Sequence, residues 1–113
     1  AERAVDWLRG AGLAVFEITM TVPDAPALIR DLARDASLLV GAGTVADRAG
    51  AEACLNAGAR FLVAPWVDAD IAAAAHATGA AAMRGAMTPT EVRAAIRAGA
   101  DPVKVCPASA AGA

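Results

Sequence analysis

Short apolar runs with β propensity alternate with helix-like segments along the whole chain. Each helix-like segment ends in a turn of small residues, an apolar run follows, and a polar turn starts the next helix. Gly58, Gly79 and Gly99 recur about every 20 residues, the length of one strand, one helix and two short loops. The pattern predicts helices over residues 2–9, 24–34, 47–57, 68–77 and 89–98, and strands over 13–20, 38–42, 61–65, 80–84 and 102–106.

Capping residues mark the predicted helix starts. Asp24, Asp47 and Asp68 each stand at such a start, and Thr88 with Glu91 has the spacing of a capping box. Strands that alternate with helices of this length require a parallel sheet with right-handed crossovers. A closed (β/α)8 barrel needs eight such units, so residues 1–113 are predicted to form a single domain that covers about five central units of a barrel. An open five-stranded sheet is the alternative, and it would leave two apolar edges exposed.

Side-chain alternation places two ionisable residues on the interior face of the predicted barrel. In strand 13–20, Phe16 and Ile18 share one face and are expected to pack beneath the helices, so Glu17 points to the interior. The same alternation places Lys104 in the interior. A buried isolated charge costs on the order of several kcal/mol, so the two groups either form a structural salt bridge or have a chemical use.

Lys104 is the only lysine in the chain and lies in an apolar run. In one interpretation its stem lies along apolar surface and its ammonium reaches water. In the other, burial favours the neutral amine, which attacks a carbonyl carbon to form a Schiff base, and Glu17 shuttles protons. Gly43 and Thr44 follow a predicted strand and offer a close backbone approach and a hydroxyl, while Pro65 ends the next strand.

Composition excludes several classes of function. The net charge of -2 comes without a basic stripe, so nucleic acid is not an expected partner. No apolar run is long enough to span a membrane. Two cysteines without CxxC spacing and a single histidine argue against a metal site, and they favour a reduced, cytoplasmic setting. We therefore expect no metal site, and the resemblance described next implies that the chain uses no cofactor and acts on a small molecule.

Five motifs in order resemble the class I aldolases that act on 2-dehydro-3-deoxy-6-phosphogluconate (KDPG) or 4-hydroxy-2-oxoglutarate (KHG). The resemblance extends over nearly the whole chain. The motifs cover residues 16–24, 40–45, 61–65, 87–91 and 103–107.

This resemblance implies cleavage of KDPG to pyruvate and glyceraldehyde 3-phosphate, within the Entner-Doudoroff pathway, by a homotrimer. It implies that Lys104 is the Schiff-base lysine and Glu17 the general acid and base. Thr44, beside Gly43, would contact the pyruvyl carboxylate, and Pro65 would line the substrate site.

The chain departs from the family pattern at two candidate substrate residues. Thr21 stands where many members carry an arginine, and Arg84 precedes Gly85 where a Pro-Gly turn is usual. We expect Arg84 to supply the positive charge for the substrate that Thr21 lacks. The family's phosphate-binding loops would follow residue 113. Two other readings stay open: an epimerase-like phosphosugar barrel in which Lys104 does acid-base work, and a catalytically silent barrel segment with an assembly role.

Overall fold

Five parallel strands form one sheet in the order β1-β2-β3-β4-β5 in a computed structural model, which describes residues 2–112. Helices alternate with the strands as the sequence predicts, and the ends of all the predicted elements agree within two residues. The strands are β1 (Val15–Thr19), β2 (Leu39–Gly43), β3 (Phe61–Ala64), β4 (Ala81–Ala86) and β5 (Val103–Val105). The helices are α1 (Glu2–Gly10), α2 (Ala25–Leu32), α3 (Arg48–Asn56), α4 (Ala69–Ala77) and α5 (Pro89–Arg97), followed by the short 3-10 helix η1 (Ala108–Ala111).

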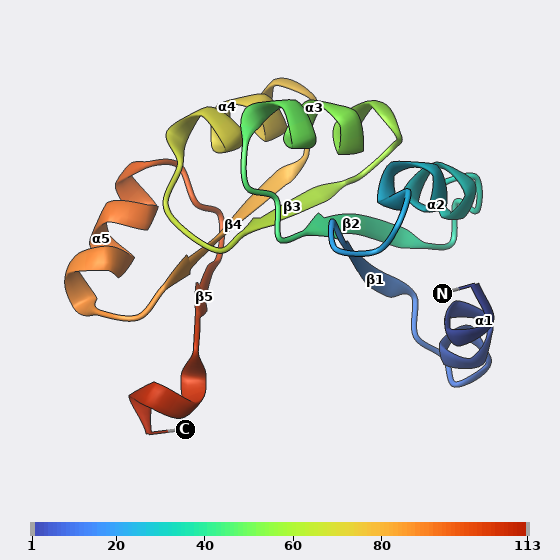
Figure 1. The fold of residues 1–113 in the computed structure, drawn as a ribbon, viewed down its shortest axis with the longest axis horizontal. Helices are drawn as coiled ribbons and strands as arrows, with labels where there is room; N and C mark the ends of the chain where they lie inside the picture. Colours follow the sequence, from blue (N-terminus) through green and yellow to red (C-terminus); the bar gives the residue numbers. More distant parts are fainter. Residues whose placement is uncertain (1, 113) are drawn as a thin grey trace.

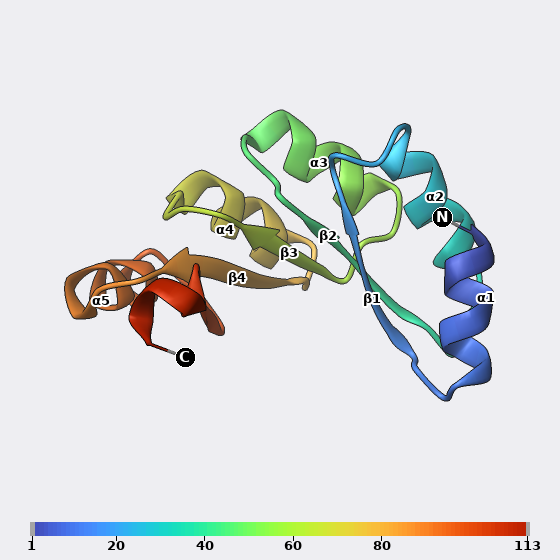
Figure 2. The same cartoon turned by 60° about the horizontal axis from the view of Figure 1, so that its bottom comes forward.

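The sheet is curved, and its two faces differ in what covers them. Helices α2 to α5 lie along the convex side of the arc, and within residues 2–112 no helix lies across its concave side (Figure 1). The turned view shows the same order of strands, with β1 and β5 at opposite ends of the arc (Figure 2). This is the arrangement expected of consecutive units of a (β/α)8 barrel. We call the helix-free concave side the inner face.

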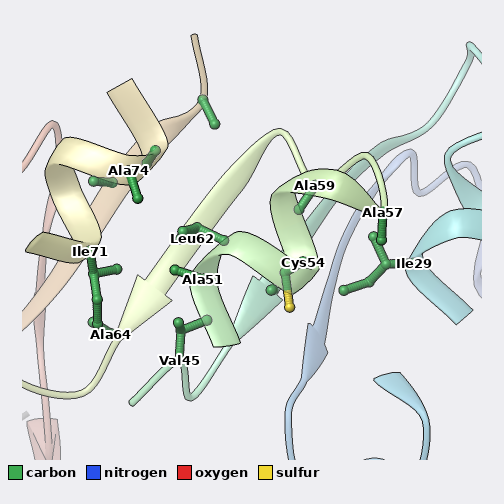
Figure 3. Close-up of a cluster of buried hydrophobic side chains, with 14 of the residues drawn as sticks. Ile29, Val45, Ala51, Cys54, Ala57, Ala59, Leu62, Ala64, Ile71 and Ala74 are labelled. Carbon is green, nitrogen blue, oxygen red and sulfur yellow. The ribbon is translucent and has the colours of Figure 1, made fainter. Parts of the chain in front are cut away.

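The hydrophobic core lies between the sheet and the helices. Leu62 of β3 is completely buried, as are Ile29 of α2 and Ala51 and Cys54 of α3 (Figure 3). Much of the remaining core is alanine, which lets the helices approach the sheet closely. Phe16 and Ile18 are also buried, whereas Val15 is 60% exposed, so the predicted assignment of faces along β1 is confirmed.

Three helix starts have the side-chain caps that the sequence predicts, and one does not. Asp47 and Asp68 accept backbone hydrogen bonds at the starts of α3 and α4, and Thr88 forms a complete capping box at α5. Asp24 instead has a φ of 54° and makes no side-chain cap bond. Pro26, the second residue of α2, has no N–H to offer, which removes one of the donors that such a cap requires.

None of the helices within residues 2–112 is long and apolar enough to cross a bilayer.

Candidate active site

Strand register places Lys104 and Glu17 on the same face of the sheet. Lys104 pairs with Gly85 of β4, and Glu17 pairs with Gly41 of β2. Paired residues of neighbouring parallel strands project to the same side, and alternate residues of one strand do so too. The ring of Phe61 occupies the space that a Cβ on Gly41 would need, so Phe61 lies on that side as well. The series that connects Glu17 to Lys104 across the inner face is Gly41, Phe61, Ala81, Met83 and Gly85.

Both ionisable side chains are exposed, which differs from the burial that the sequence predicts. The ion pairs found among residues 2–112 do not include a bridge between Glu17 and Lys104. The physical reason is that five strands form an open arc and not a closed wall, so solvent reaches the inner face. The structural salt bridge considered from the sequence is therefore not present in this chain.

The carboxylate of Glu17 lies directly against Gly43. A Cβ added to Gly43 would overlap the carboxyl group, so only glycine leaves room for this side-chain position. Thr44 follows at the end of β2 with a φ of 56°, a left-handed conformation that is uncommon for a threonine, and its side chain is exposed. Gly43 and Glu17 thus come together at the carboxyl end of β2, and Thr44 follows Gly43 in the chain.

A pair of hydroxyl groups adds to this polar end of the sheet. Thr19 Oγ1 lies 2.6 Å from Thr21 Oγ1, so one hydroxyl donates to the other. Thr19 shares the inner face with Glu17 because it lies two residues further along β1. Thr21 was a predicted site residue and Thr19 was not. The alternation that assigned Glu17 to the interior was the signal for Thr19 as well.

Pro65 lies at the carboxyl end of β3 and is exposed. Its carbonyl oxygen lies so close to Gly85 that a Cβ there would overlap it. This close approach brings the loop after β3 against β4 at Gly85, the strand partner of Lys104. Pro65 therefore lies beside Gly85, one strand away from Lys104.

Arg84 is a correction to the sequence-based expectation. Its side chain is completely buried, and its strand partner is Val103, so it projects to the helix layer and not to the inner face. None of its three guanidinium nitrogens has a hydrogen-bond partner. Burial lowers the pKa of Arg84, and the carboxylate of Asp68 opposes that shift. From this position Arg84 does not supply positive charge beside Lys104.

A pocket of about 430 Å³ lies on the inner face toward the amino ends of the strands. Apolar side chains form most of its walls, and Glu17 forms its border on the side of the candidate site. In (β/α)8 barrels, layers of side chains fill the interior at this level, whereas the chemistry takes place at the carboxyl ends of the strands. Within residues 2–112, no group of three or more histidine, cysteine, aspartate or glutamate residues is placed to hold a metal ion.

His76 lies at the opposite end of the sheet from the candidate site. Its Nε2 is 2.8 Å from Asp101 Oδ2, and the same oxygen accepts a 2.7 Å hydrogen bond from the N–H of Ala82, near the start of β4. The Ala82 N–H and then the His76 hydrogen bond lower the pKa of Asp101. These contacts join α4 to the loop before β5, and Lys104 is not a partner in either of them.

The fold and the site together define a class of protein. A curved parallel sheet with helices on its outer side, and with a lysine and a carboxylate on the inner face, is the architecture of half a (β/α)8 enzyme barrel. A family model, described as KDPG and KHG aldolase, matches residues 1–113. The chain therefore belongs to the KDPG and KHG aldolase family.

Individual relatives agree with this assignment. A probable 2-dehydro-3-deoxy-6-phosphogalactonate aldolase of Rhizobium meliloti is 37% identical over 99% of this chain and 54% of its own length. The 2-keto-3-deoxy-6-phosphogluconate aldolase of Zymomonas mobilis, solved with 3-phosphoglycerate, is 33% identical with a TM-score of 0.78, covering 89% of this chain and 48% of that chain.

A third relative has a covalently captured ligand. The KDPG aldolase of Legionella pneumophila, solved with pyruvate as a covalent carbinolamine, is 28% identical with a TM-score of 0.83, covering 96% of this chain and 53% of that chain. The chain thus spans about half the length of the relatives it matches. The predicted partial barrel is confirmed by this alignment to about half of each barrel structure.

Proposed function

We propose that this chain provides the catalytic half of a class I aldolase, in which Lys104 forms a Schiff base with a 2-keto acid. The proposed reaction cleaves KDPG, or its galactonate isomer, to pyruvate and glyceraldehyde 3-phosphate. The observation that carries the proposal is the strand register, which gives Lys104 and Glu17 the same face of the sheet. The covalent carbinolamine in the Legionella relative supports the same chemistry.

The proposed steps assign one role to each side chain. The amine of Lys104 adds to the C2 carbonyl of the substrate, and loss of water gives a cationic imine. This imine accepts the electron pair that is released when the C3–C4 bond breaks. Glu17, directly or through a water molecule, moves the protons needed for carbinolamine collapse and for deprotonation of the C4 hydroxyl. No step requires a metal or an organic cofactor.

The hydroxyl-bearing residues at the strand ends are proposed to bind substrate. The backbone at Gly43 lies beside the Glu17 carboxylate and Thr44 follows it in the chain, and both suit the pyruvyl carboxylate. Thr19, at the end of β1, and Thr21 offer a pair of neutral hydrogen-bonding groups. Such a pair is suited to sugar hydroxyls more than to an anion. Initial rates with KDPG, its galactonate isomer and 4-hydroxy-2-oxoglutarate, measured on the full-length protein, decide among the three substrates.

The homotrimer and the place in the Entner-Doudoroff pathway belong to the same proposal for the whole protein. Sedimentation of the full-length protein tests the trimer, and product analysis tests the pathway step.

Reductive trapping tests the proposed chemistry. Pyruvate and borohydride are expected to add a reduced pyruvyl group to the full-length protein, located on Lys104 by peptide mass spectrometry. The Lys104→Met variant retains its α-amino group and so controls for trapping at the N-terminus. Glu17→Gln is expected to form the adduct while exchanging the methyl protons of pyruvate slowly. A folded wild-type protein that gains no adduct refutes the aldolase and favours the epimerase-like or silent alternatives.

A further inference from the structure

Strand β2 has little side-chain volume on the inner face. Gly41 is the strand partner of Glu17, so Gly41 and, two residues further on, Gly43 lie on this face. Of the five residues of β2, Leu39 is the only one with a side chain there. Strands β1 and β3 lie on either side of β2 (Figure 2). Side chains of both neighbouring strands can therefore enter the space over the two glycines.

Two side chains occupy this space at different heights along β2. A Cβ on Gly41 would overlap the ring of Phe61, which comes from β3. A Cβ on Gly43 would overlap the carboxyl group of Glu17, which comes from β1. Phe61 is half-buried, and it borders the same inner-face pocket as Glu17. The ring thus fills the space nearer the amino end of β2, and the carboxyl group fills the space nearer its carboxyl end.

The ring of Phe61 accounts for the direction that the Glu17 side chain takes. The backbone of Glu17 is level with Gly41. Its carboxyl group nevertheless lies over Gly43, two residues and so about 6–7 Å further along β2. No ion pair among residues 2–112 holds this carboxyl group in place. Packing therefore sets its position, because the space directly opposite Glu17 is already filled by the ring.

We infer that Phe61 is a positioning residue for the proposed proton transfer, because its ring fills the space over Gly41 and so directs the Glu17 carboxylate toward the carboxyl ends of the strands. The inference rests on the proposed Schiff-base function, in which Glu17 moves the protons. A displacement of about 1 Å in a catalytic group can cost about 100-fold in rate. Phe61 acts only through Glu17, so its loss should slow proton transfer and leave imine formation at Lys104 intact.

Two assays on the full-length protein separate these steps. Deuterium exchange into the methyl group of pyruvate measures proton transfer, and borohydride trapping measures imine formation. Phe61→Ala is expected to lower the exchange rate by about 10- to 100-fold and to gain the reduced pyruvyl adduct to the wild-type extent. Phe61→Leu keeps apolar volume over Gly41 and should recover most of the exchange rate.

Val15→Ala is the matched control. Val15 lies on β1 and borders the same pocket as Phe61, but it is level with Leu39 and not with Gly41. Val15→Ala therefore removes apolar volume from the pocket without emptying the space opposite Glu17. It should exchange at the wild-type rate.

A paired substitution makes the test specific for the space over Gly41. Gly41→Val alone forces a side chain against the ring of Phe61, so it should slow exchange and still form the adduct. Combined with Phe61→Ala, the same substitution puts apolar atoms back into the emptied space. The double variant should therefore exchange faster than either single variant, a non-additivity expected of residues in contact.

Four results would overturn the inference while leaving the proposed function standing. Phe61→Ala exchanges at the wild-type rate; Phe61→Ala loses exchange and adduct in equal measure, which shows general damage to the inner face; Val15→Ala slows exchange as much as Phe61→Ala does; or the double variant is no faster than the single variants. A wild type with neither adduct nor exchange refutes the proposed function, and this inference with it.

Discussion

Replacing Arg84 with methionine is expected to stabilise the protein. The guanidinium is completely buried in the helix-facing layer, and Nε, Nη1 and Nη2 have no hydrogen-bond partner. Burial lowers the pKa of Arg84 more than the Asp68 carboxylate raises it, so the charge is held at a net cost. Methionine has a similar unbranched stem and no charge, and it can fill the same space between β4 and the helices.

The expected gain follows from the balance of burial and attraction. Replacing buried charged groups by apolar residues of similar volume is often neutral or stabilising by about 1–4 kcal/mol, and here no hydrogen bond is lost in exchange. Asp68 keeps its own partners, because it accepts from the N–H groups of Asp70 and Ile71 at the start of α4. We therefore expect Arg84→Met to raise the free energy of unfolding by about 1–3 kcal/mol. For a domain of this size that corresponds to a rise in Tm of about 4–8 °C per kcal/mol.

Urea denaturation, followed by tryptophan fluorescence and far-UV circular dichroism, measures this change. Arg93→Met is the matched control, because Arg93 is exposed on α5, and such surface changes stay within about 0.5 kcal/mol. A destabilised Arg84→Met variant would refute the reasoning. It would mean that the guanidinium gains more from its surroundings in the folded protein than its burial costs.

Two further predictions concern the site and the opposite end of the sheet. Gly43→Ala should displace the Glu17 carboxylate and slow deuterium exchange into pyruvate about 10-fold or more, the scale of general acid-base catalysis. Gly10→Ala is the control, because a Cβ at Gly10 meets no other atom, and it should leave the exchange rate unchanged. A wild-type exchange rate in Gly43→Ala would contradict the contact between Gly43 and Glu17. The folded-state pKa of Asp101 lies below its ordinary value of 3.8. The ionised carboxylate therefore stabilises the folded protein above that pH, and this contribution is lost as the pH falls through the folded-state pKa. In urea titrations, Asp101→Asn should therefore have a lower free energy of unfolding than wild type at pH 7, and this difference should narrow below about pH 4. A difference that does not change with pH would exclude the Asp101 carboxylate as its source.

Local chemistry explains why most of the fold could be predicted from the sequence. The helix caps at Asp47, Asp68 and Thr88 act within a few residues, so a single sequence contains both the donor and the acceptor. The face of Glu17 was also predictable. Large apolar residues on one side of β1 contrast with smaller or polar residues on the other, and a period of two fixes the rest.

The layer of Arg84 could not be predicted in the same way. Strand β4 contains alanine and glycine at most positions, so the apolar contrast that orients β1 is missing there. The sheet decides the orientation of β4 through its register with β3 and β5, which involves residues far apart in the sequence. The exposure of Lys104 has a related cause. Its enclosure requires strands that close the barrel, and no property of residues 103–105 determines whether those strands are present.

The role of Gly43 shows where sequence motifs stop being informative about this site. In the sequence, Gly43 belongs to a short Gly-Ala-Gly turn after a strand, which suggests that the backbone there lies close to a ligand. In the structure, Gly43 makes room for a carboxylate that comes from the neighbouring strand. A motif describes neighbours along one strand, but the groups proposed to react are assembled across strands, from β1, β2 and β5. A substitution on the inner face should therefore first displace a side chain of the neighbouring strand. Gly43 is a positioning residue for Glu17 in this sense.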